Sequence, residues 1–383
     1  SHPMSLLPTP SVLVPAPDNQ NNPLMSIIMQ EIEKLGGWMG FDRYMEMALY
    51  YPGLGYYSSG STKFGLMPSS GSDFVTSPEL SPLFGQCLAK QVNQALTQTQ
   101  TTEVWEFGAG SGALAKQLLG QLEPNVHYHI IELSADLQSR QAKTLEKYSS
   151  RVTWHQSLPE RMEGVVVGNE VLDAMPVKLL QRIENQWFER GVTIYKDELN
   201  FADVLTDLRP PIDISGKHDY LTELPQQGIA FIRTLAHHLQ KGAAFFIDYG
   251  FPESEYYHAQ RQMGTVVCHR AHQVDMNPLI DPGLKDITAH VDFTAMAMAW
   301  QNAGDEMHPP KELGTLGYCN QGRFLLNCDI TDYLSQASIQ EQNASLKLLQ
   351  EHEMGELFKV MGLYVDQAWD ACGFMQGDKS HTL

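Results

Sequence analysis

Residues 101–113 read TTEVWEFGAGSGA, and this stretch decides the fold class. The apolar run 104–107 leads directly into the glycine-rich segment 108–112, and the helical pattern 113–119 follows without a gap. Strand, glycine turn and helix in this order form the nucleotide-binding element of a doubly wound α/β domain. Glycines let the backbone turn sharply and approach a ligand that a Cβ would block. We therefore predict an α/β fold built on a parallel sheet.

The residues around the glycines bear on which nucleotide binds. Gly108, Gly110 and Ala113 satisfy the G-x-G-x-x-G/A dinucleotide pattern, which is a weak signal alone. Glu106 precedes the first glycine by two residues, and a carboxylate at a strand end suits a cationic ligand better than a pyrophosphate. The order E-x-G-x-G is similar to motif I of class I methyltransferases, so we predict S-adenosylmethionine at Glu106, Gly108, Gly110 and Gly112. An NAD(P)-dependent oxidoreductase and a glycine turn without a ligand stay open.

Two further segments are candidates for contacts with the cofactor. Residues 127–133, HYHIIEL, predict a second strand that ends at Glu132, and in this fold class such a carboxylate accepts both ribose hydroxyls. An NAD enzyme would carry the same acid, so Glu132 supports the fold without choosing the ligand. Ser157 and Leu158 follow the third predicted strand and are candidates for adenine contacts, with an ordinary loop as the alternative.

Composition narrows the class of protein. The 383 residues are 43% hydrophobic and carry a formal net charge of −19, which argues against nucleic acid or anionic membranes as the main partner. A basic protein substrate is mildly favoured. No run of 18 apolar residues exists, so we expect no membrane insertion. Five scattered cysteines without C-x-x-C argue against a disulfide framework or a zinc site, and the histidines show no metal-ligand spacing, so we expect no metal.

The order of patterns along the chain predicts its organisation. After a disordered leader at 1–23, we expect a helical segment at 24–100 whose Ser-, Gly- and Pro-rich loop 58–78 forms a lid, because loops of that length are often functional. The core at 101–330 has predicted parallel strands at 102–107, 127–132, 151–154, 164–169 and 243–250, and inserted elements at about 177–240. These inserted elements are an antiparallel hairpin turning at Glu184-Asn185 and a helix over 219–240. A last antiparallel strand pair is expected within 312–328, and a helical tail at 331–383 ends the chain.

Seven motifs in one order resemble the MidA-like family of class I methyltransferases, from about residue 25 to 330. They are YMEMALY (44–50), GYY (55–57), GSDFVTSPE (71–79), EFGAGSG (106–112), GNEVLDAMPV (168–177), FIDYG (246–250) and DITAHVDF (286–293). The resemblance implies a Rossmann-like sheet, S-adenosyl-L-methionine binding and methylation of a protein arginine. In mitochondrial members the substrate is a respiratory complex I subunit. Ala109 stands where the family often has proline, which bears on the stiffness of the turn and not on the ligand.

The resemblance also bears on where the protein works. It implies the cytoplasm for a bacterial member and the mitochondrial matrix for eukaryotic relatives. The sequence is compatible with a homodimer.

The segment after the apolar strand 165–167 carries the predicted chemistry. Asn169 and Glu170 stand at the carboxyl end of that strand, where a ligand binds in an open α/β sheet. Asp173 shares a face with Glu170 if residues 170–174 turn helically. Two carboxylates suit the planar donors of a guanidinium, so we predict that Asn169, Glu170 and Asp173 hold the substrate arginine. The alternative is that both acids only cap the following helix.

The remaining candidates are less specific. Asp73, Phe74, Ser77, Pro78 and Glu79 end the predicted lid, and the resemblance places them over the cofactor.

His290 and Asp292 can be read as a catalytic dyad or as structural residues. A protein that keeps the cofactor site as a relic and acts as an assembly chaperone is a third functional hypothesis, beside the methyltransferase and the oxidoreductase.

Overall fold

The computed structural model describes residues 4–6, 22–58, 76–270, 273–350 and 354–383. The chain divides into two compact units. The core unit takes residues 69–172, 229–252 and 291–383, and the insertion unit takes residues 1–68, 173–228 and 253–290. Each unit is therefore assembled from segments that lie far apart in the sequence.

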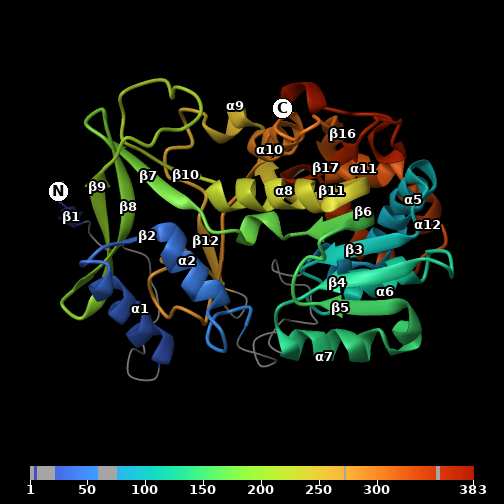
Figure 1. Ribbon diagram of the computed structural model, residues 1–383, viewed down its shortest axis with the longest axis horizontal. Helices are drawn as coiled ribbons and strands as arrows, with labels where there is room; N and C mark the ends of the chain where they lie inside the picture. Colours follow the sequence, from blue (N-terminus) through green and yellow to red (C-terminus); the bar gives the residue numbers. More distant parts are fainter. Residues whose placement is uncertain (1–3, 7–21, 59–75, 271–272, 351–353) are drawn as a thin grey trace. The chain divides into compact units, whose positions relative to one another are not determined.

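A mixed sheet forms the centre of the core unit (Figure 1). Its strand order is β16 (Leu313–Asn320), β17 (Phe358–Val365), β11 (Leu239–Phe251), β6 (Met162–Asn169), β3 (Glu103–Phe107), β4 (His127–Ile131) and β5 (Val152–His155). β11, β6, β3, β4 and β5 run parallel, whereas β17 pairs antiparallel with both β11 and β16. The short β15 (Val291–Asp292) adds a parallel contact to β11.

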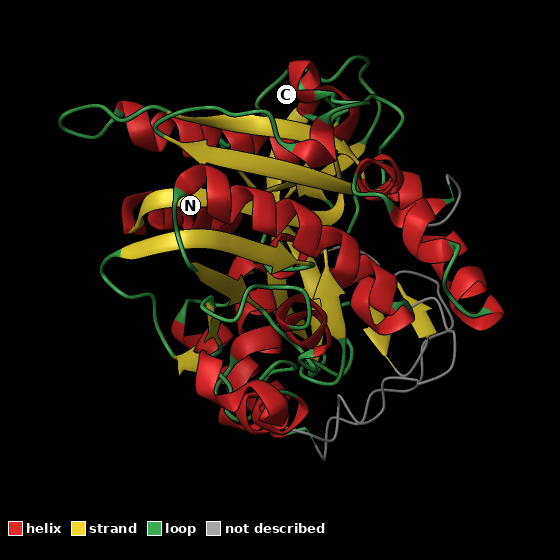
Figure 2. Cartoon of the chain, turned by 90° about the vertical axis from the view of Figure 1, so that its right-hand side faces the viewer, coloured by secondary structure: helices red, strands yellow, loops and turns green. Residues whose placement is uncertain are grey.

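Apolar side chains cover both faces of this sheet. Val165 and Val167 in β6 join one buried cluster, together with leucines and valines of α5 (Pro82–Thr99) and α6 (Ala113–Leu119). Val166 points to the opposite cluster, with residues of α8 (Gln226–His238) and α10 (Phe293–Asp305). Each fully buried valine or leucine stabilises the fold by about 1.5–3 kcal/mol. The core unit is thus doubly wound, and Figure 2 shows helices alongside the strands.

Antiparallel strands dominate the insertion unit. Its larger sheet runs β1 (Met4–Leu6), β9 (Glu198–Leu205), β8 (Gln186–Tyr195), β7 (Lys178–Ile183) and β10 (Tyr220–Leu224), with β2 (Met39–Gly40) on β8. α1 (Pro23–Lys34) and α2 (Phe41–Tyr50) share a buried cluster with β7 and β8. Glu184 and Asn185 both have positive φ, as do Lys196 and Asp197. Two-residue turns of this kind match the right-handed twist of hairpin strands.

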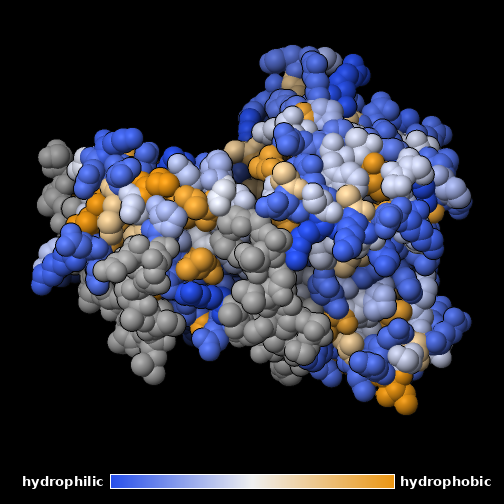
Figure 3. Space-filling view, turned by 90° about the horizontal axis from the view of Figure 1, so that it is seen from below, coloured by the Kyte–Doolittle hydropathy of each residue, from blue (hydrophilic) through white to orange (hydrophobic). Residues whose placement is uncertain are grey.

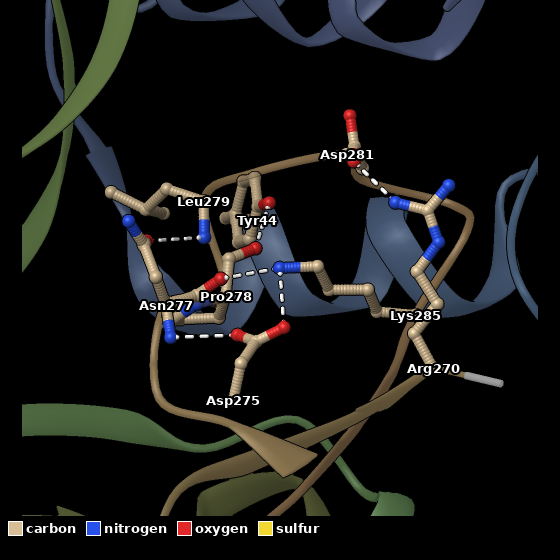
Figure 4. A network of polar contacts seen from close by, with 8 residues as sticks. All are labelled: Tyr44, Arg270, Asp275, Asn277, Pro278, Leu279, Asp281 and Lys285. Atoms are coloured by element: carbon tan, nitrogen blue, oxygen red, sulfur yellow. Dashed lines mark hydrogen bonds and ion pairs between the residues drawn. The ribbon is translucent and has the colours of Figure 1, made fainter. Parts of the chain in front are cut away.

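A buried ion pair anchors the segment between β13 (Gln273–Asp275) and β14 (Asp286–Thr288) in the insertion unit (Figure 4). The ammonium of Lys285, which is 1% exposed, lies 2.8 Å from Asp275 Oδ2 and donates to the Asn277 carbonyl at 3.0 Å. The Tyr44 hydroxyl donates to the Pro278 carbonyl. A buried charge is tolerated only when it is paired and hydrogen-bonded, so these contacts fix where β14 begins.

One face of the molecule is mainly polar. On the face seen in Figure 3, hydrophilic residues predominate and hydrophobic residues lie scattered among them. None of the helices in the described part of the chain has both the length and the apolar character needed to cross a bilayer.

Most elements of the core agree with the sequence analysis. The strands at 103–107, 127–131, 152–155 and 162–169 and the central strand 239–251 are found where the patterns predicted them. The hairpin of β7 and β8 turns at Glu184 and Asn185 as expected.

Four predictions about local structure are wrong. The last antiparallel strand pair is not contained within 312–328, because β16 pairs with β17 and residues 321–327 form α11 (Gln321–Asn327). The tail is therefore not purely helical. Residues 220–224 form β10 instead of the start of the helix 219–240, since their backbone pairs with β7. Residues 4–6 of the expected leader pair with β9, while the rest of the leader up to residue 21 lies outside the described residues.

Two glycines allow β6 and β11 to approach closely. Gly164 and Gly242 are paired in register, and a Cβ on Gly242 would stand 1.7 Å from the Gly164 carbonyl oxygen. Gly242→Ala should lower the free energy of unfolding by at least about 2 kcal/mol, because backbone atoms must move to admit the methyl group.

Gly53→Ala is the matched control for this substitution. Gly53 also has positive φ, but no described atom lies within 4 Å of its Cβ position. Only the backbone penalty of about 1–2 kcal/mol applies there. Denaturant unfolding of both variants checks the prediction, and equal losses would contradict it.

Candidate functional site

The parallel strands of the core unit end in register at one edge of the sheet. Phe107 of β3 pairs with Ile131 of β4 and with Gly168 of β6, and Ile131 pairs with His155 of β5. The residues that come next on these strands are Gly108, Glu132, Gln156 and Asn169. Ligands of open α/β sheets bind outside the carboxyl ends of the strands, so this edge is the candidate site.

The glycine turn lies at this edge between β3 and α6. Gly108, Gly110 and Gly112 have φ of +62°, +55° and +89°, values that L side chains rarely adopt. A Cβ on Gly110 would meet no described atom within 4 Å. The backbone is therefore open at Gly110, where a ligand could approach it closely.

The carboxylate of Glu132 is held in place by two donors. Its Oε2 accepts the Ser134 amide at 3.2 Å, and its Oε1 accepts the Gln141 side-chain amide at 3.0 Å. Burial raises the pKa of Glu132, and these hydrogen bonds oppose the shift because they favour the charged form. The carboxylate is thus oriented before any ligand arrives.

Gln141 in α7 (Ala135–Thr144) ties this acid to the glycine turn, and the sequence analysis missed it. Its Nε2 also donates to the Gly110 carbonyl at 3.0 Å, while its Oε1 accepts from Trp154 Nε1 at 2.9 Å. Gln141 is fully buried and lies four residues after the buried Leu137. The sequence held one signal for this role, because Gln141 occupies a position on the buried face of an amphipathic helix where an apolar residue is expected.

Glu106 faces a buried tyrosine. Its side chain is 2% exposed, and its Oε1 accepts the Tyr128 hydroxyl at 2.6 Å. Burial raises the pKa of Glu106 to about 7, opposed by the Tyr128 hydrogen bond, while the nearby Glu132 charge adds to the rise. The prediction that the Glu106 carboxylate contacts the cofactor stays a prediction.

The described part of the predicted lid segment contacts the glycine turn. Ser77, Pro78 and Glu79 belong to α4 (Ser77–Leu80). The Ser111 hydroxyl donates to the Glu79 carboxylate, and Gln117 Nε2 of α6 donates to the Pro78 carbonyl at 2.8 Å. Ser77 itself is fully buried, so its side chain packs inside the core unit. Asp73 and Phe74 lie outside the described part of the chain, as do residues 59–75 of the predicted lid 58–78. The predicted motion of the lid stays a prediction.

Ser157 and Leu158 follow β5 at the same edge. The last residue of that strand, His155, accepts the Glu132 amide through its carbonyl at 2.9 Å, which joins the ends of β4 and β5. Ser157 is exposed, and Leu158 is partly buried against the apolar cluster that includes Phe107. This placement is compatible with an adenine contact, which stays a prediction.

Asn169 ends β6 with an unsatisfied acceptor. Its Oδ1 is buried and has no hydrogen-bond partner among the described residues. An unpaired buried acceptor costs about 1–3 kcal/mol, so such an atom at a ligand-binding edge indicates a donor that arrives from outside the chain.

The segment after Asn169 differs from the predicted helical turn. Glu170 has φ +55°, which is the left-handed region, and only residues 172–174 form a short 3₁₀ helix. The prediction that 170–174 turn helically, so that Glu170 and Asp173 share one helix face, is therefore wrong. A strained backbone at one non-glycine residue is often found at functional sites, where the surroundings enforce it.

Asp248 in β11 enforces this conformation, and the sequence analysis did not assign it a role. Asp248 is fully buried, with Oδ2 accepting the Leu172 amide at 3.0 Å and Oδ1 accepting the Tyr249 amide at 2.9 Å. The Glu170 amide donates to the Ile247 carbonyl at 2.9 Å. These bonds fix the loop on both sides of Glu170.

Asp173 begins a segment of the insertion unit that is rich in tyrosine contacts. Its carbonyl accepts the Ala289 amide at 2.9 Å, and the Ala174 carbonyl accepts the Tyr50 hydroxyl at 2.7 Å. The Tyr57 hydroxyl donates to Asp286 Oδ1 at 2.7 Å. Burial raises the pKa of Asp286 to about 7, although the Tyr57 hydrogen bond favours the charged form.

The second residue of the suggested dyad has a structural role. Asp292 is 1% exposed, and its Oδ1 accepts the Ala295 amide at 3.1 Å, so it caps the first turn of α10. The backbone amide of His290 donates a hydrogen bond to Thr265 Oγ1 at 3.0 Å.

Within the part of the chain that the structure covers, no three His, Cys, Asp or Glu side chains are arranged to hold a metal ion.

Comparisons with known proteins bear on this site. The family described as "Putative S-adenosyl-L-methionine-dependent methyltransferase" matches residues 87–310. A protein from Burkholderia thailandensis described as a "likely methyl transferase" has a crystal structure bound to S-adenosyl-homocysteine. It shares 46% sequence identity and a TM-score of 0.87, over 97% of this chain and 100% of that chain.

Two mitochondrial proteins are more distant relatives. The protein arginine methyltransferase NDUFAF7 of Danio rerio is 28% identical over 369 residues, which are 82% of this chain and 81% of that protein. The protein of the same name from Homo sapiens is 27% identical over 404 residues, 91% of this chain and 85% of that protein.

Gln141→Leu should weaken binding of S-adenosylhomocysteine about tenfold or more. Leucine keeps the volume of the side chain but leaves the Gly110 carbonyl and the Glu132 carboxylate without their shared donor, and each lost hydrogen bond contributes about 0.5–1.5 kcal/mol. Titration calorimetry measures the change. Gln138→Leu on the same helix is the control, because the Gln138 side chain donates to the Glu132 backbone carbonyl and not to the Glu132 carboxylate or to Gly110. Equal affinity of the parent and the Gln141 variant would remove Gln141 from the site.

Glu106 should make stability depend on pH. Because its pKa rises from 4.5 to about 7 on folding, the native state binds more protons than the unfolded state between these values. Its contribution to the free energy of unfolding is therefore lost as pH rises through this window, by up to about 3 kcal/mol. Glu106→Gln should gain stability relative to the parent between pH 4.5 and 8. Denaturant unfolding across pH checks this, with the exposed Glu123→Gln as control, and parallel curves for parent and Glu106→Gln would refute it.

Proposed function

Since the chain belongs to this family of S-adenosyl-L-methionine-dependent methyltransferases, we propose that it methylates an arginine side chain of a protein substrate. The cofactor is S-adenosyl-L-methionine, which decides the choice left open between this molecule and a nicotinamide dinucleotide. The class I methyltransferase fold predicted from the sequence is confirmed by the relative of TM-score 0.87.

The residues at the sheet edge fit this cofactor. The space beside Gly110 would be filled by a Cβ, and the Glu132 carboxylate, held by Ser134 and Gln141, can accept the two hydroxyls of a ribose. We propose that Gly108, Gly110, Gly112 and Glu132 hold the cofactor. Glu106, Ser157 and Leu158 are proposed as further contacts. When bound, the cofactor supplies an electrophilic methyl group on a sulfonium.

The observation that carries the arginine proposal is the pair of side chains at the end of β6, Asn169 and Glu170. The buried Asn169 Oδ1 needs a donor, and the carboxylate of Glu170 follows it directly. A guanidinium offers donors in a planar fork and a positive charge, and it matches both groups. The two relatives named protein arginine methyltransferases support the same substrate class.

These side chains can perform two tasks in methyl transfer. Asn169 and Glu170 orient one guanidinium nitrogen, since an in-line displacement depends on the position of the nucleophile. Glu170 also draws the positive charge toward the other nitrogens and accepts the proton that the methylated nitrogen gives up. Asp248 holds the loop that carries Glu170 and is a positioning residue. Asp173 is proposed as a second carboxylate on the strength of the sequence alone.

The natural substrate that we propose is a subunit of respiratory complex I, as the family resemblance implies. The competing function is an assembly chaperone that binds the cofactor without transferring its methyl group. Incubation of the purified protein with S-adenosyl-L-methionine carrying a labelled methyl group and with isolated complex I separates the two. Mass spectrometry should place a methyl group on an arginine; label on another residue type, or none, would overturn the proposal.

Glu170→Gln should reduce the rate of methyl transfer about ten- to a hundredfold. The substitution keeps the shape but removes a charge-assisted hydrogen bond of about 1.5–3 kcal/mol, and 1.4 kcal/mol corresponds to a factor of ten. Affinity for S-adenosylhomocysteine should not change. Glu163→Gln, on the exposed start of the same strand, is the control. Retained activity would exclude Glu170 from catalysis, and activity lost together with cofactor affinity would assign Glu170 to the cofactor site.

A further inference from the structure

Two cysteines of the core unit lie side by side although 44 positions separate them in the chain. Cys328 caps the carboxyl end of α11 and is fully buried, while Cys372 begins the short helix η4 (Cys372–Phe374) and is partly exposed. The two thiols lie close enough for each to shift the pKa of the other, and the Cys372 thiol also donates to Gln91 Oε1 at 3.6 Å. The backbones are tied as well, because the Asn327 side chain donates to the Gly373 carbonyl at 2.7 Å.

The surroundings favour the thiolate of Cys372. The hydrogen bond with Cys328 lowers the pKa of the Cys372 thiol below its ordinary value, and the Lys90 ammonium and nearby backbone amides act in the same direction against burial. The same hydrogen bond and burial raise the pKa of Cys328. Lys90 is held nearby by its ion pair with Asp329, the neighbour of Cys328. The thiolate is the nucleophilic form of cysteine, so Cys372 is the reactive member of the pair.

Cys87 and Cys319, two of the other three cysteines, differ from this pair. Burial raises the pKa of the Cys319 and Cys87 thiols to about 12, and both side chains are fully buried. Structural cysteines in such surroundings are inert toward oxidants, whereas a partly exposed thiolate beside a second thiol is the arrangement of redox-responsive pairs.

We propose that Cys328 and Cys372 are a site of reversible oxidation that forms a disulfide when the protein meets a hydroperoxide. In the first step the Cys372 thiolate attacks a peroxide oxygen, the O–O bond breaks, and a sulfenic acid forms at Cys372 as the leaving oxygen takes a proton. In the second step the Cys328 sulfur attacks the Cys372 sulfur, the S–O bond breaks, and hydroxide leaves with the Cys328 proton as water. Two thiols lose two electrons, and hydrogen peroxide is reduced to two molecules of water.

The bond would close a loop that contains β17. This strand lies between β16 and β11, and η4 follows it in the chain. Cys328 precedes β17 in the chain and Cys372 follows it. A disulfide between them would therefore link the segment before this strand covalently to the segment after it. In a reducing compartment the bond would be transient, because the thiol pool reverses it when the peroxide is spent.

The test uses the full chain, reduced and then treated with hydrogen peroxide. After the remaining thiols are blocked by alkylation, digestion and mass spectrometry should find a peptide pair linked through Cys328 and Cys372, which dithiothreitol separates. A link between Cys372 and Cys87, or no link at all, would overturn the proposal. Before oxidation, Cys372 should react with iodoacetamide at least ~10-fold faster than Cys319 at neutral pH. Equal rates would contradict the assigned reactivity.

Two single variants separate the steps. Cys328→Ser removes the resolving thiol, so a dimedone adduct should accumulate at Cys372 on oxidation. Cys372→Ser should abolish the disulfide and leave Cys328 unmodified. Cys319→Ser is the matched control and should form the disulfide as the parent does. Absence of the dimedone adduct in a Cys328→Ser protein whose circular dichroism matches the parent would refute Cys372 as the site of attack.

Discussion

The register of the parallel strands is the constraint on which the site depends. β3 is paired on one side with β4 and on the other with β6, so that Phe107 lies level with both Ile131 and Gly168. The residues that come next are then Gly108, Glu132 and Asn169, of which the first and last are 61 positions apart in the sequence. Because side chains alternate along a strand, a slip of one residue in either pairing would turn every side chain of the slipped strand to the opposite face. The alternation of Val165, Val166 and Val167 between two apolar clusters makes such a slip costly.

The strands of the core could be predicted because their signals are local. Runs such as 165–167 are apolar throughout and end at a glycine or a polar residue, and the same holds for 243–247. β10 gave no such signal, and in β17 the apolar run 360–365 is interrupted by Gly362. Polar and apolar residues alternate little along 358–365. These residues form a strand because they pair with β11 and β16, which lie more than 37 positions earlier in the chain. Pairings of that kind depend on the tertiary structure and override local preference.

The residues of the candidate site could likewise be predicted only where their signal is local. The glycines, Glu132 and Asn169 stand next to strand ends, so their position at the binding edge follows from the fold. Gln141 and Asp248 act through bonds to residues 31 and 76 positions away, Gly110 and Leu172. Their roles could not be predicted from the residues next to them in the sequence. The left-handed conformation of Glu170 has the same origin, because its loop is held by the Ile247 carbonyl and the Asp248 carboxylate of β11, which is distant in the sequence.

The folded core extends beyond the part of the chain that the family match covers. That match ends at residue 310, whereas β16 and β17 complete the sheet at 313–320 and 358–365. Without β17, the central strand β11 would present an unpaired edge along residues 243–249, all apolar or aromatic except Asp248. An exposed, long apolar edge is a site of aggregation. Asp248 lies on this strand and fixes the loop that carries Glu170, so an intact edge at β11 is also a condition for the geometry of the site. The relative bound to S-adenosyl-homocysteine covers 97% of this chain, which agrees with a functional unit that includes these last strands.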